Sequence, residues 1–98
     1  MRYTLRVIES FRHAGLEKFF ASRSKLGIQP KHAARLSLQL FALSRAKSPA
    51  DLAVPGWGLH GLRGRSKGRW AMVVSGNWRL TFAFHAENVV LVDYEDYH

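Results

Sequence analysis

The chain of 98 residues contains no cysteine, so it can form neither a disulfide nor a thiolate metal site. It also lacks an uninterrupted apolar run of the roughly 18 to 20 residues that a membrane-spanning helix needs. The N-terminal letters MRYTLRVIESF show no apolar stretch followed by small residues, which a secretory signal peptide would have. These absences favour a cytoplasmic protein with no membrane partner.

Acidic residues are also scarce. The chain has 7 Asp and Glu against 15 Lys and Arg, which is a formal net charge of +8. No acidic residue falls between positions 52 and 86, a stretch that holds Arg63, Arg65, Lys67, Arg69 and Arg79. Such an unbalanced positive field attracts polyanions, above all nucleic acid. The alternative is a solvated basic surface that only keeps the protein soluble.

Hydrophobic spacing predicts two helices in the first half of the chain. In the first, over residues 13–27, apolar side chains recur at helical spacing and Gly27 is expected to end the helix. In the second, over residues 30–46, Pro30 suits the first turn because the N–H that proline lacks would be unpaired there. The buried stripe of the second helix is predicted to contain Ala33, Leu36, Leu40 and Leu43, widened by Phe41. Its solvated side is predicted to contain Lys31, Arg35 and Gln39, and His13 and His32 are expected on helix surfaces.

The pattern changes to β in the second half. Short strands are predicted at 59–62, 70–74, 78–84 and 89–94, after a connecting loop at 46–58, while residues 3–9 have only weak strand character. Helices followed by a run of antiparallel strands indicate the α+β class, here two N-terminal helices packed on a mostly antiparallel β-sheet. With 98 residues and 47% hydrophobic composition, the chain is expected to be one domain, 1–98.

The central hairpin has a predicted register. A three-residue loop at 75–77, with Gly76 or Asn77 in the left-handed conformation, keeps all the large apolar side chains on one face, which should pack against the helices. The cross-strand pairs predicted by this loop are Val74–Trp78, Met72–Leu80 and Trp70–Phe82. The other face is predicted to receive Ala71, Val73, Arg79, Thr81, Ala83 and His85. An arginine among small residues in mid-strand indicates a concave anion site.

The loop RGRSKGR, residues 63–69, lacks the spacing of a phosphate-binding P-loop, and no helix is predicted after it. Its charge suits contact with an RNA backbone; alternatively, its basic residues only protect a sheet edge from aggregation. No pair of the five histidines has the spacing of a zinc motif, and no metal or cofactor is expected. His60 lies in a short predicted strand, either as a structural residue or as part of the groove around Arg79.

The chain ends in DYEDYH, residues 93–98, which holds three of the seven acidic residues. An imidazole passes protons near neutral pH, and His98 follows Asp96 and Tyr97, either of which can orient it. RNA cleavage by attack of a 2′-hydroxyl requires an arginine to hold phosphate and a histidine to move a proton. The alternative is a frayed polar tail.

Five stretches carry a family resemblance: SFRHAGLEKFF at 10–20, GIQPKHAARLSLQL at 27–40, LHGLRGRSKGRW at 59–70, GNWRLTF at 76–82 and DYEDYH at 93–98. They resemble the HigB toxins, also called proteic killer proteins, of the RelE/ParE toxin superfamily. The resemblance implies a compact RelE-like microbial RNase fold and cleavage of mRNA in the A site of the ribosome, without a cofactor. It also implies a HigA-type antitoxin as partner, in a toxin–antitoxin complex of higher order on operator DNA.

Carried over by position, the resemblance implies that Arg79 stabilises the scissile phosphate and that His98 acts in proton transfer. Asp96 and Tyr97 would support His98 or contact the mRNA. Arg63 stands where the family usually has a lysine, in a PLKGD-like segment that reads GLRGR here. Arginine keeps the charge but is too basic to act readily as acid or base, so an electrostatic role is expected for Arg63.

The expected RNA- and ribosome-binding residues are His60, Arg65, Lys67 and Arg69, where Arg65 replaces an acid of the family segment. Residues 1–7 precede the usual start of such toxins and are interpreted either as the result of a misassigned start codon or as an N-terminal extension. Two other functions stay open. One is a ParE-like toxin that binds a protein target such as gyrase without cutting RNA, and the other is a simple RNA-binding module.

Overall fold

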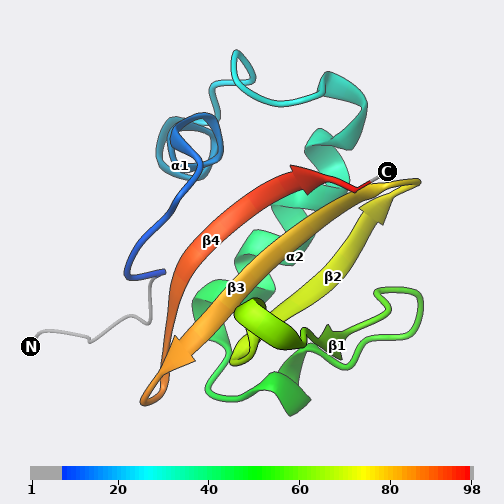
Figure 1. Ribbon diagram of the computed structural model, residues 1–98. Coiled ribbons are helices and arrows are strands. Elements are labelled where there is room, and N and C mark those ends of the chain that lie inside the picture. The colour runs from blue at the N-terminus through cyan, green and yellow to red at the C-terminus, as the bar shows by residue number, and fades with distance from the viewer. Residues whose placement is uncertain (1–7, 98) are drawn as a thin grey trace, which may run out of the picture.

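The computed structural model describes residues 8–97, so most of the weak strand predicted at 3–9 and all of His98 lie outside the described residues. Two α-helices, α1 (Ala14–Ser22) and α2 (Ala33–Arg45), precede the strands β1 (His60–Gly61), β2 (Arg69–Ser75), β3 (Trp78–His85) and β4 (Asn88–Asp96). Short 3₁₀ helices lie between them: η1 (Pro30–His32), η2 (Pro49–Leu52) and η3 (Gly64–Ser66). The strands form an antiparallel sheet in the order β1-β2-β3-β4 (Figure 1), which confirms the α+β class.

The described chain begins with an extended segment and not with a helix. Residues 8–12 run beside β4, where Phe11 pairs with Val92 in parallel and the Glu9 N–H donates to the Val89 carbonyl (2.8 Å). The two helices therefore follow a segment that extends the sheet beyond β4. This parallel pairing is why the sheet is mostly, and not wholly, antiparallel.

Helix α1 begins at a histidine cap and ends earlier than predicted. Nδ1 of His13 accepts a hydrogen bond from the Leu16 N–H (2.9 Å), so His13, predicted on a helix surface, is the half-buried N-cap of the helix. Arg23 adopts a left-handed φ of 67° and its N–H closes the last helical turn. This residue, and not the predicted Gly27, ends the helix, because the left-handed conformation turns the chain away from the helix axis.

Gly27 instead permits a close approach between two backbone segments. A β-carbon on Gly27 would lie 2.5 Å from the Cα of Gly15, and one on Gly15 would lie 2.7 Å from the Cα of Gly27. Contacts this short do not occur between real side chains and backbone, so both positions require glycine. The pair holds the loop after α1 against the first turn of that helix.

The predicted apolar stripe of α2 is largely correct. Leu36, Leu40 and Leu43 are buried, as expected, but Phe41 is 62% exposed and does not widen the stripe. Gln39, predicted on the solvated side, is fully buried. Its Nε2 donates to a main-chain carbonyl of β2 (2.9 Å), and a buried amide is tolerated when it finds such a partner.

The loop predicted at 46–58 contains η2 and is tied to the rest of the fold at two points. The half-buried Arg35, predicted to be solvated, donates from Nη2 to the carbonyl of Gly56 (2.9 Å). The carbonyl of the buried Trp57 accepts from the N–H of Val73 in β2 (2.7 Å). Arg35 therefore connects α2 to this loop.

The β2–β3 hairpin has the predicted register over most of its length. Met72 pairs with Leu80 and Trp70 with Phe82, as expected, and Gly76 takes the left-handed conformation with a φ of 53°. The pair predicted at the loop is wrong: Trp78 faces Ser75, and the register shifts between Val73 and Ser75. A two-residue turn followed by a β-bulge thus replaces the three-residue loop and restores the same downstream pairing.

The two faces of the sheet differ in what covers them. Both helices pack on one face (Figure 1), where their apolar residues form a buried core with the side chains of Met72, Leu80, Phe82, Val92 and Tyr94. In the part of the chain that the structure describes, no α-helix lies against the opposite face, which is called the open face below. Within residues 8–97, no helix is long and apolar enough to cross a membrane.

Candidate active site

The open face gathers charged and hydroxyl side chains from neighbouring strands. In the sheet register, Arg79 of β3 lies opposite Glu95 of β4, and Thr81 lies opposite Asp93. Directly paired residues share one face of a sheet, so these four side chains form one group. Ala71 of β2, paired with Thr81, contributes only a methyl group to this face. The predicted small-residue face around an arginine is therefore present, with two carboxylates added to it.

Arg79 is half-buried and lies against the hairpin turn. Its Nη1 donates to the carbonyls of Gly76 (2.7 Å) and Trp78 (3.1 Å). No hydrogen bond from Nη2 or Nε to any other described residue is found. The guanidinium carbon lies 5.8 Å from the ring centroid of Tyr97, within the range of a cation–π contact. Within residues 8–97, Arg79 thus uses only Nη1 for its hydrogen bonds.

A second arginine, Arg69 at the start of β2, reaches across the same face. Its Nη2 donates to Oγ1 of Thr81 (2.8 Å) and to the carbonyl of Leu91 (3.0 Å). Leu91 has a φ of 58° and lies where the β3–β4 register shifts, so its carbonyl is outside the regular ladder. The positive charge of loop 63–69 predicted Arg69 only as an RNA-binding residue. Its position two residues before Ala71, and so on the same face of a strand, is the signal in the sequence that could have placed it here.

Thr81 connects Arg69 to a carboxylate. It is fully buried, and its hydroxyl accepts from Arg69 and donates to Oε2 of Glu95 at 2.5 Å. The C-terminal sequence DYEDYH did not predict a role for Glu95. A continuous hydrogen-bonded chain therefore runs from Arg69 through Thr81 to Glu95.

Tyr97 completes the group at the end of the sheet. Its N–H donates to the carbonyl of Asn77 in the β2–β3 turn (2.8 Å), which holds the residue beside Arg79. Burial raises the pKa of the Tyr97 hydroxyl, and the negative charge of Glu95 adds to the rise, while Arg69 and Arg79 act in the opposite direction. The hydroxyl is therefore protonated at neutral pH and available as a hydrogen-bond donor.

The other predicted catalytic residues lie in different surroundings. Asp96 pairs with Trp78, which places it on the helix side of β4 together with Tyr94 and not on the open face. His98 follows Tyr97 directly but lies outside the described residues. Arg63 is exposed and precedes η3 in the β1–β2 connection.

The predicted RNA-binding residues surround the open face. His60 pairs with Ala71 and so shares this face, where its Nδ1 lies 2.9 Å from the carbonyl of Gly58. Arg65 and Lys67 are exposed in the loop around η3. Figure 1 shows this loop in front of the strands, on the side away from α2. Among the described residues, no group of three or more His, Asp and Glu is arranged to hold a metal ion.

The helix side of β4 is pinned by a buried histidine. His32, predicted on a helix surface, is only 2% exposed, and its Nδ1 lies 2.6 Å from the hydroxyl of Tyr94. That hydroxyl also accepts from the Gln29 N–H (3.3 Å). Burial lowers the pKa of His32, and the charge of Lys31 lowers it further. The imidazole is therefore neutral at neutral pH, and it shares one hydrogen bond with the hydroxyl of Tyr94.

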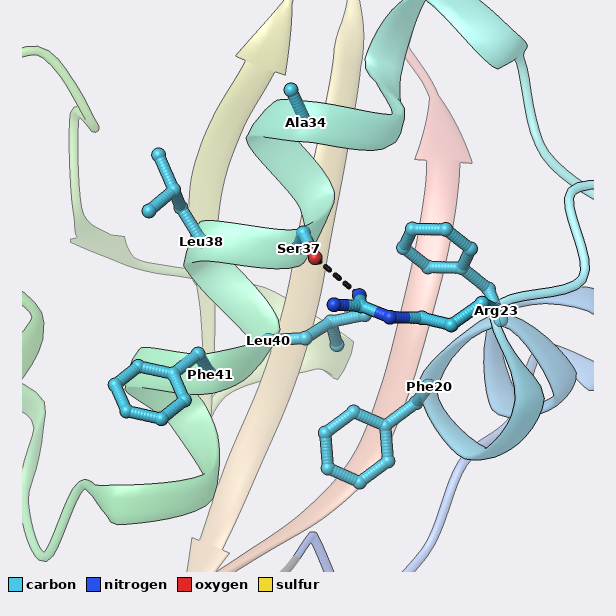
Figure 2. Close-up of a pocket in the computed structure, with 8 residues that line it drawn as sticks. Phe20, Arg23, Ala34, Ser37, Leu38, Leu40 and Phe41 are labelled. Carbon is cyan, nitrogen blue, oxygen red and sulfur yellow. Dashed lines mark hydrogen bonds between the residues drawn. The ribbon is translucent and has the colours of Figure 1, made fainter.

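A pocket of about 560 Å³ lies between α1 and α2, on the helix side (Figure 2). Its lining is mostly apolar, with Phe20, Leu38 and Phe41 around it. Arg23 extends from the end of α1 across the pocket and donates to the hydroxyl of Ser37 (2.5 Å). The described lining includes no histidine or carboxylate.

Fold and site together define a small α+β protein with a basic, carboxylate-containing site on the uncovered face of its sheet. A family model described as the RelE-like toxin of the type II toxin–antitoxin system HigB matches residues 9–98. The chain is also 34% identical over 92 residues to Endoribonuclease HigB from Proteus vulgaris, covering 94% of this chain and 100% of the relative. The chain belongs to the HigB family of RelE-like toxins. This membership implies an antitoxin as its partner.

Proposed function

We propose that this toxin is an endoribonuclease that cleaves mRNA on the ribosome by attack of a 2′-hydroxyl on the adjacent phosphate. The proposal includes a RelE-like microbial RNase fold and a reaction that needs no metal. The observation that supports it best is the convergence of Arg69 and Arg79 with Glu95 and Tyr97 on the open face. The relative named Endoribonuclease HigB adds support from sequence.

Arg79 is proposed to stabilise the scissile phosphate. A phosphorane carries more negative charge on its oxygens than the phosphodiester does, and donors aimed at those oxygens lower the barrier. The bonds of Arg79 to Gly76 and Trp78 use only Nη1, which favours phosphate binding through Nη2 and Nε. Arg63 is proposed to add positive charge without exchanging protons, because arginine stays protonated at all relevant pH values.

His98 is proposed to act in proton transfer, supported by its place directly after Tyr97. Tyr97 is proposed to contact the mRNA or to orient His98, since its hydroxyl is protonated at neutral pH. Asp96 is proposed to act indirectly, because it lies on the face of β4 that carries Tyr94. The reaction needs one group to accept the 2′-hydroxyl proton and another to protonate the departing 5′-oxygen.

The ribosome is proposed to arrange the substrate. A site with few acid–base groups gains much of its rate from a linkage already held near attack geometry. His60, Arg65, Lys67 and Arg69 are proposed to contact rRNA or mRNA, because they surround the open face with positive charge or imidazole. The antitoxin partner is proposed to be of the HigA type, in a higher-order complex on operator DNA.

The decisive experiment maps mRNA ends after brief expression of the toxin, and compares ribosome-bound with naked mRNA in vitro. We expect cuts in ribosome-bound mRNA, weak cleavage of naked RNA, and resistance of a message with a 2′-deoxy sugar at the cut position, since the nucleophile is absent. Arg79→Ala should lower the cleavage rate by about 100-fold or more. His98→Ala should also abolish growth arrest.

Arg45→Ala is the matched control, because it removes the same charge from the end of α2 on the helix side. It should cleave like the unmodified protein. Growth arrest with intact mRNA would overturn the proposal in favour of a ParE-like toxin. Binding to ribosomes without cleavage or arrest would indicate a simple RNA-binding module.

A further inference from the structure

The resemblance assigns no role to Glu95, yet its carboxylate is held on the open face by a chain of hydrogen bonds. Oε2 of Glu95 accepts the hydroxyl proton of Thr81 at 2.5 Å, and the same hydroxyl accepts from Arg69 at 2.8 Å. A threonine hydroxyl has a single proton to donate. Because Glu95 receives it, the direction of the whole chain of bonds is determined.

These hydrogen bonds orient the carboxylate of Glu95 toward the open face, where the substrate is proposed to bind. Thr81 is fully buried and cannot rotate into solvent, and Arg69 is itself anchored to the carbonyl of Leu91 (3.0 Å). Oε2 of Glu95 is thereby fixed from beneath the open face. For Oε1, no hydrogen bond to another described residue is found, so this oxygen is free to accept a proton from a bound molecule.

Every strand brings charged or titratable groups to the open face that Glu95 shares. They are His60 on β1, Arg69 on β2, Arg79 on β3, and Asp93 and Tyr97 on the β4 side. Both arginines carry a positive charge, which attracts an anionic linkage to this face. An anionic linkage drawn to Arg79 would arrive next to Glu95, because these two residues are direct cross-strand partners.

We propose that Glu95 is the general base of the cleavage reaction, with Thr81 and Arg69 as its positioning residues. This inference rests on the proposed endoribonuclease function. Oε1 of Glu95 accepts the proton of the 2′-hydroxyl while the 2′-oxygen forms a bond to phosphorus. The bond from phosphorus to the 5′-oxygen breaks, and that oxygen takes a proton from a second group, for which His98 is proposed. The products are a 2′,3′-cyclic phosphate and a 5′-hydroxyl, and Glu95 then returns its proton to solvent.

The neighbouring carboxylates are less suited to this role. Asp93 also lies on the open face, but its Oδ1 accepts from the N–H of Tyr94 (2.9 Å), which turns it back toward its own backbone. Asp96 lies on the helix side. Glu95 is therefore the carboxylate whose position combines the open face, a fixed orientation and direct pairing with Arg79.

The test uses the full-length protein, ribosomes programmed with a defined mRNA, and single-turnover cleavage measured across pH. Glu95→Gln keeps the size and the acceptor for Thr81 but cannot take the proton. We expect its cleavage rate to fall about 100-fold or more, and the decline on the acid side of the wild-type rate profile to disappear. Glu17→Gln, which removes the same charge from the exposed first turn of α1, should leave the rate and its pH profile unchanged.

Measurements of mRNA binding show whether Glu95 takes part in the reaction or only holds the substrate. A non-cleavable mRNA with a 2′-deoxy sugar should bind Glu95→Gln at least as tightly as wild type, since one negative charge has left a cationic face. Thr81→Val should cut the rate roughly 10-fold by freeing the base, and Thr81→Ser should restore it. Melting curves verify that each variant is folded.

The outcomes distinguish the inference from the proposed function. If the wild-type protein never cleaves mRNA, both the role of Glu95 and the endoribonuclease function are overturned. Cleavage by Glu95→Gln at the wild-type rate, with an unchanged pH profile, would overturn the assignment of the base and leave the endoribonuclease in place. A folded Glu95→Gln protein that loses binding and cleavage together would also overturn it, because Glu95 would then hold the substrate.

Discussion

Tyr94 joins the helix layer to the strand that carries the candidate active site. Its hydroxyl is bonded to His32 and Gln29, and its ring centroid lies 4.5 Å from that of Trp78. The next residue, Glu95, projects from the other face of the same strand. Because adjacent strand residues cannot rotate independently, the anchoring of Tyr94 on one face holds the carboxylate on the other.

The anchor at His32 predicts a pH-dependent stability. Burial lowers the pKa of His32 from its ordinary value of 6.5, so below that pH the unfolded chain takes up a proton that the folded chain refuses. The contribution of His32 is therefore present above pH 6.5 and is lost as pH falls below it. At pH about 7.5, His32→Gln should lower the free energy of unfolding by about 1–3 kcal/mol.

Urea unfolding of wild type and His32→Gln between pH about 5.5 and 7.5 measures this effect. The stability advantage of wild type should shrink toward the acid end. His85→Gln is the control, because His85 is exposed at the end of β3, and its effect on the free energy of unfolding should be small. A wild-type advantage that stays constant across this range would contradict the prediction.

At the scale of elements, the two bulges decide which side chains share the open face. The bulge near Val74 compensates for the two-residue turn, so that Met72 still pairs with Leu80. The bulge at Leu91 inserts one residue into β4, between the pairs Thr81–Asp93 and Ala83–Val90. An inserted residue reverses the alternation beyond it, and this reversal turns Asp93 and Glu95 away from the helices.

The packing of α1 depends on the close approach of Gly15 and Gly27. Gly27→Ala would bring a β-carbon to 2.5 Å from the Cα of Gly15, so the loop and the helix must move apart. We expect a loss of about 1–3 kcal/mol in the free energy of unfolding, measured by denaturant titration. Gly61→Ala is the control, because a β-carbon there meets its nearest atoms at 3.8 Å or more. Equal stability of the two variants would show that the close approach imposes no strain on an added methyl group.

At the scale of the whole molecule, the open face is basic and the opposite face is covered by helices. The net charge of +8 and the exposed loop around η3 predict salt-sensitive binding to ribosomes. Arg65→Gln with Lys67→Gln should weaken binding and reduce the slope of log affinity against log salt by about 2, or roughly 1 for each phosphate that is no longer neutralised. Sedimentation with ribosomes at several salt concentrations measures this slope.

The control is Arg45→Gln with Lys47→Gln, which removes the same charge at and after the end of α2. Its slope should stay close to that of wild type, because those residues lie away from the open face. Equal slopes for the two double variants would mean that net charge alone, and not the loop, governs the attraction.

Local patterns in the sequence predicted the elements and much of the site. The apolar spacing of α2, the strand limits, the register at Met72 and Trp70, and the place of Arg79 on a small-residue face all depend on neighbours within a few residues. Such spacings of about 3.6 and 2 residues are visible in a single chain. The terminal tyrosine was also identified from the sequence, and Tyr97 does lie beside Arg79.

Other features required contacts between distant segments. Nothing local distinguishes Gln39 as a buried residue, because its partner is a carbonyl of β2. His32 is buried only because Tyr94, far along the chain, reaches it. In both cases a polar side chain enters the core at a point where another element offers it a hydrogen bond.

The sequence alone therefore determined the α+β class, the positions of α2 and of the strands, and the excess of positive charge, since periodicity and composition are properties of the chain itself. Only the tertiary structure decided which face of β4 carries Glu95. A strict alternation from the buried Val89 would have put Glu95 in the core, and the extra residue at Leu91 reverses that order. A bulge depends on the partner strand, so its consequence appears only when the sheet has formed.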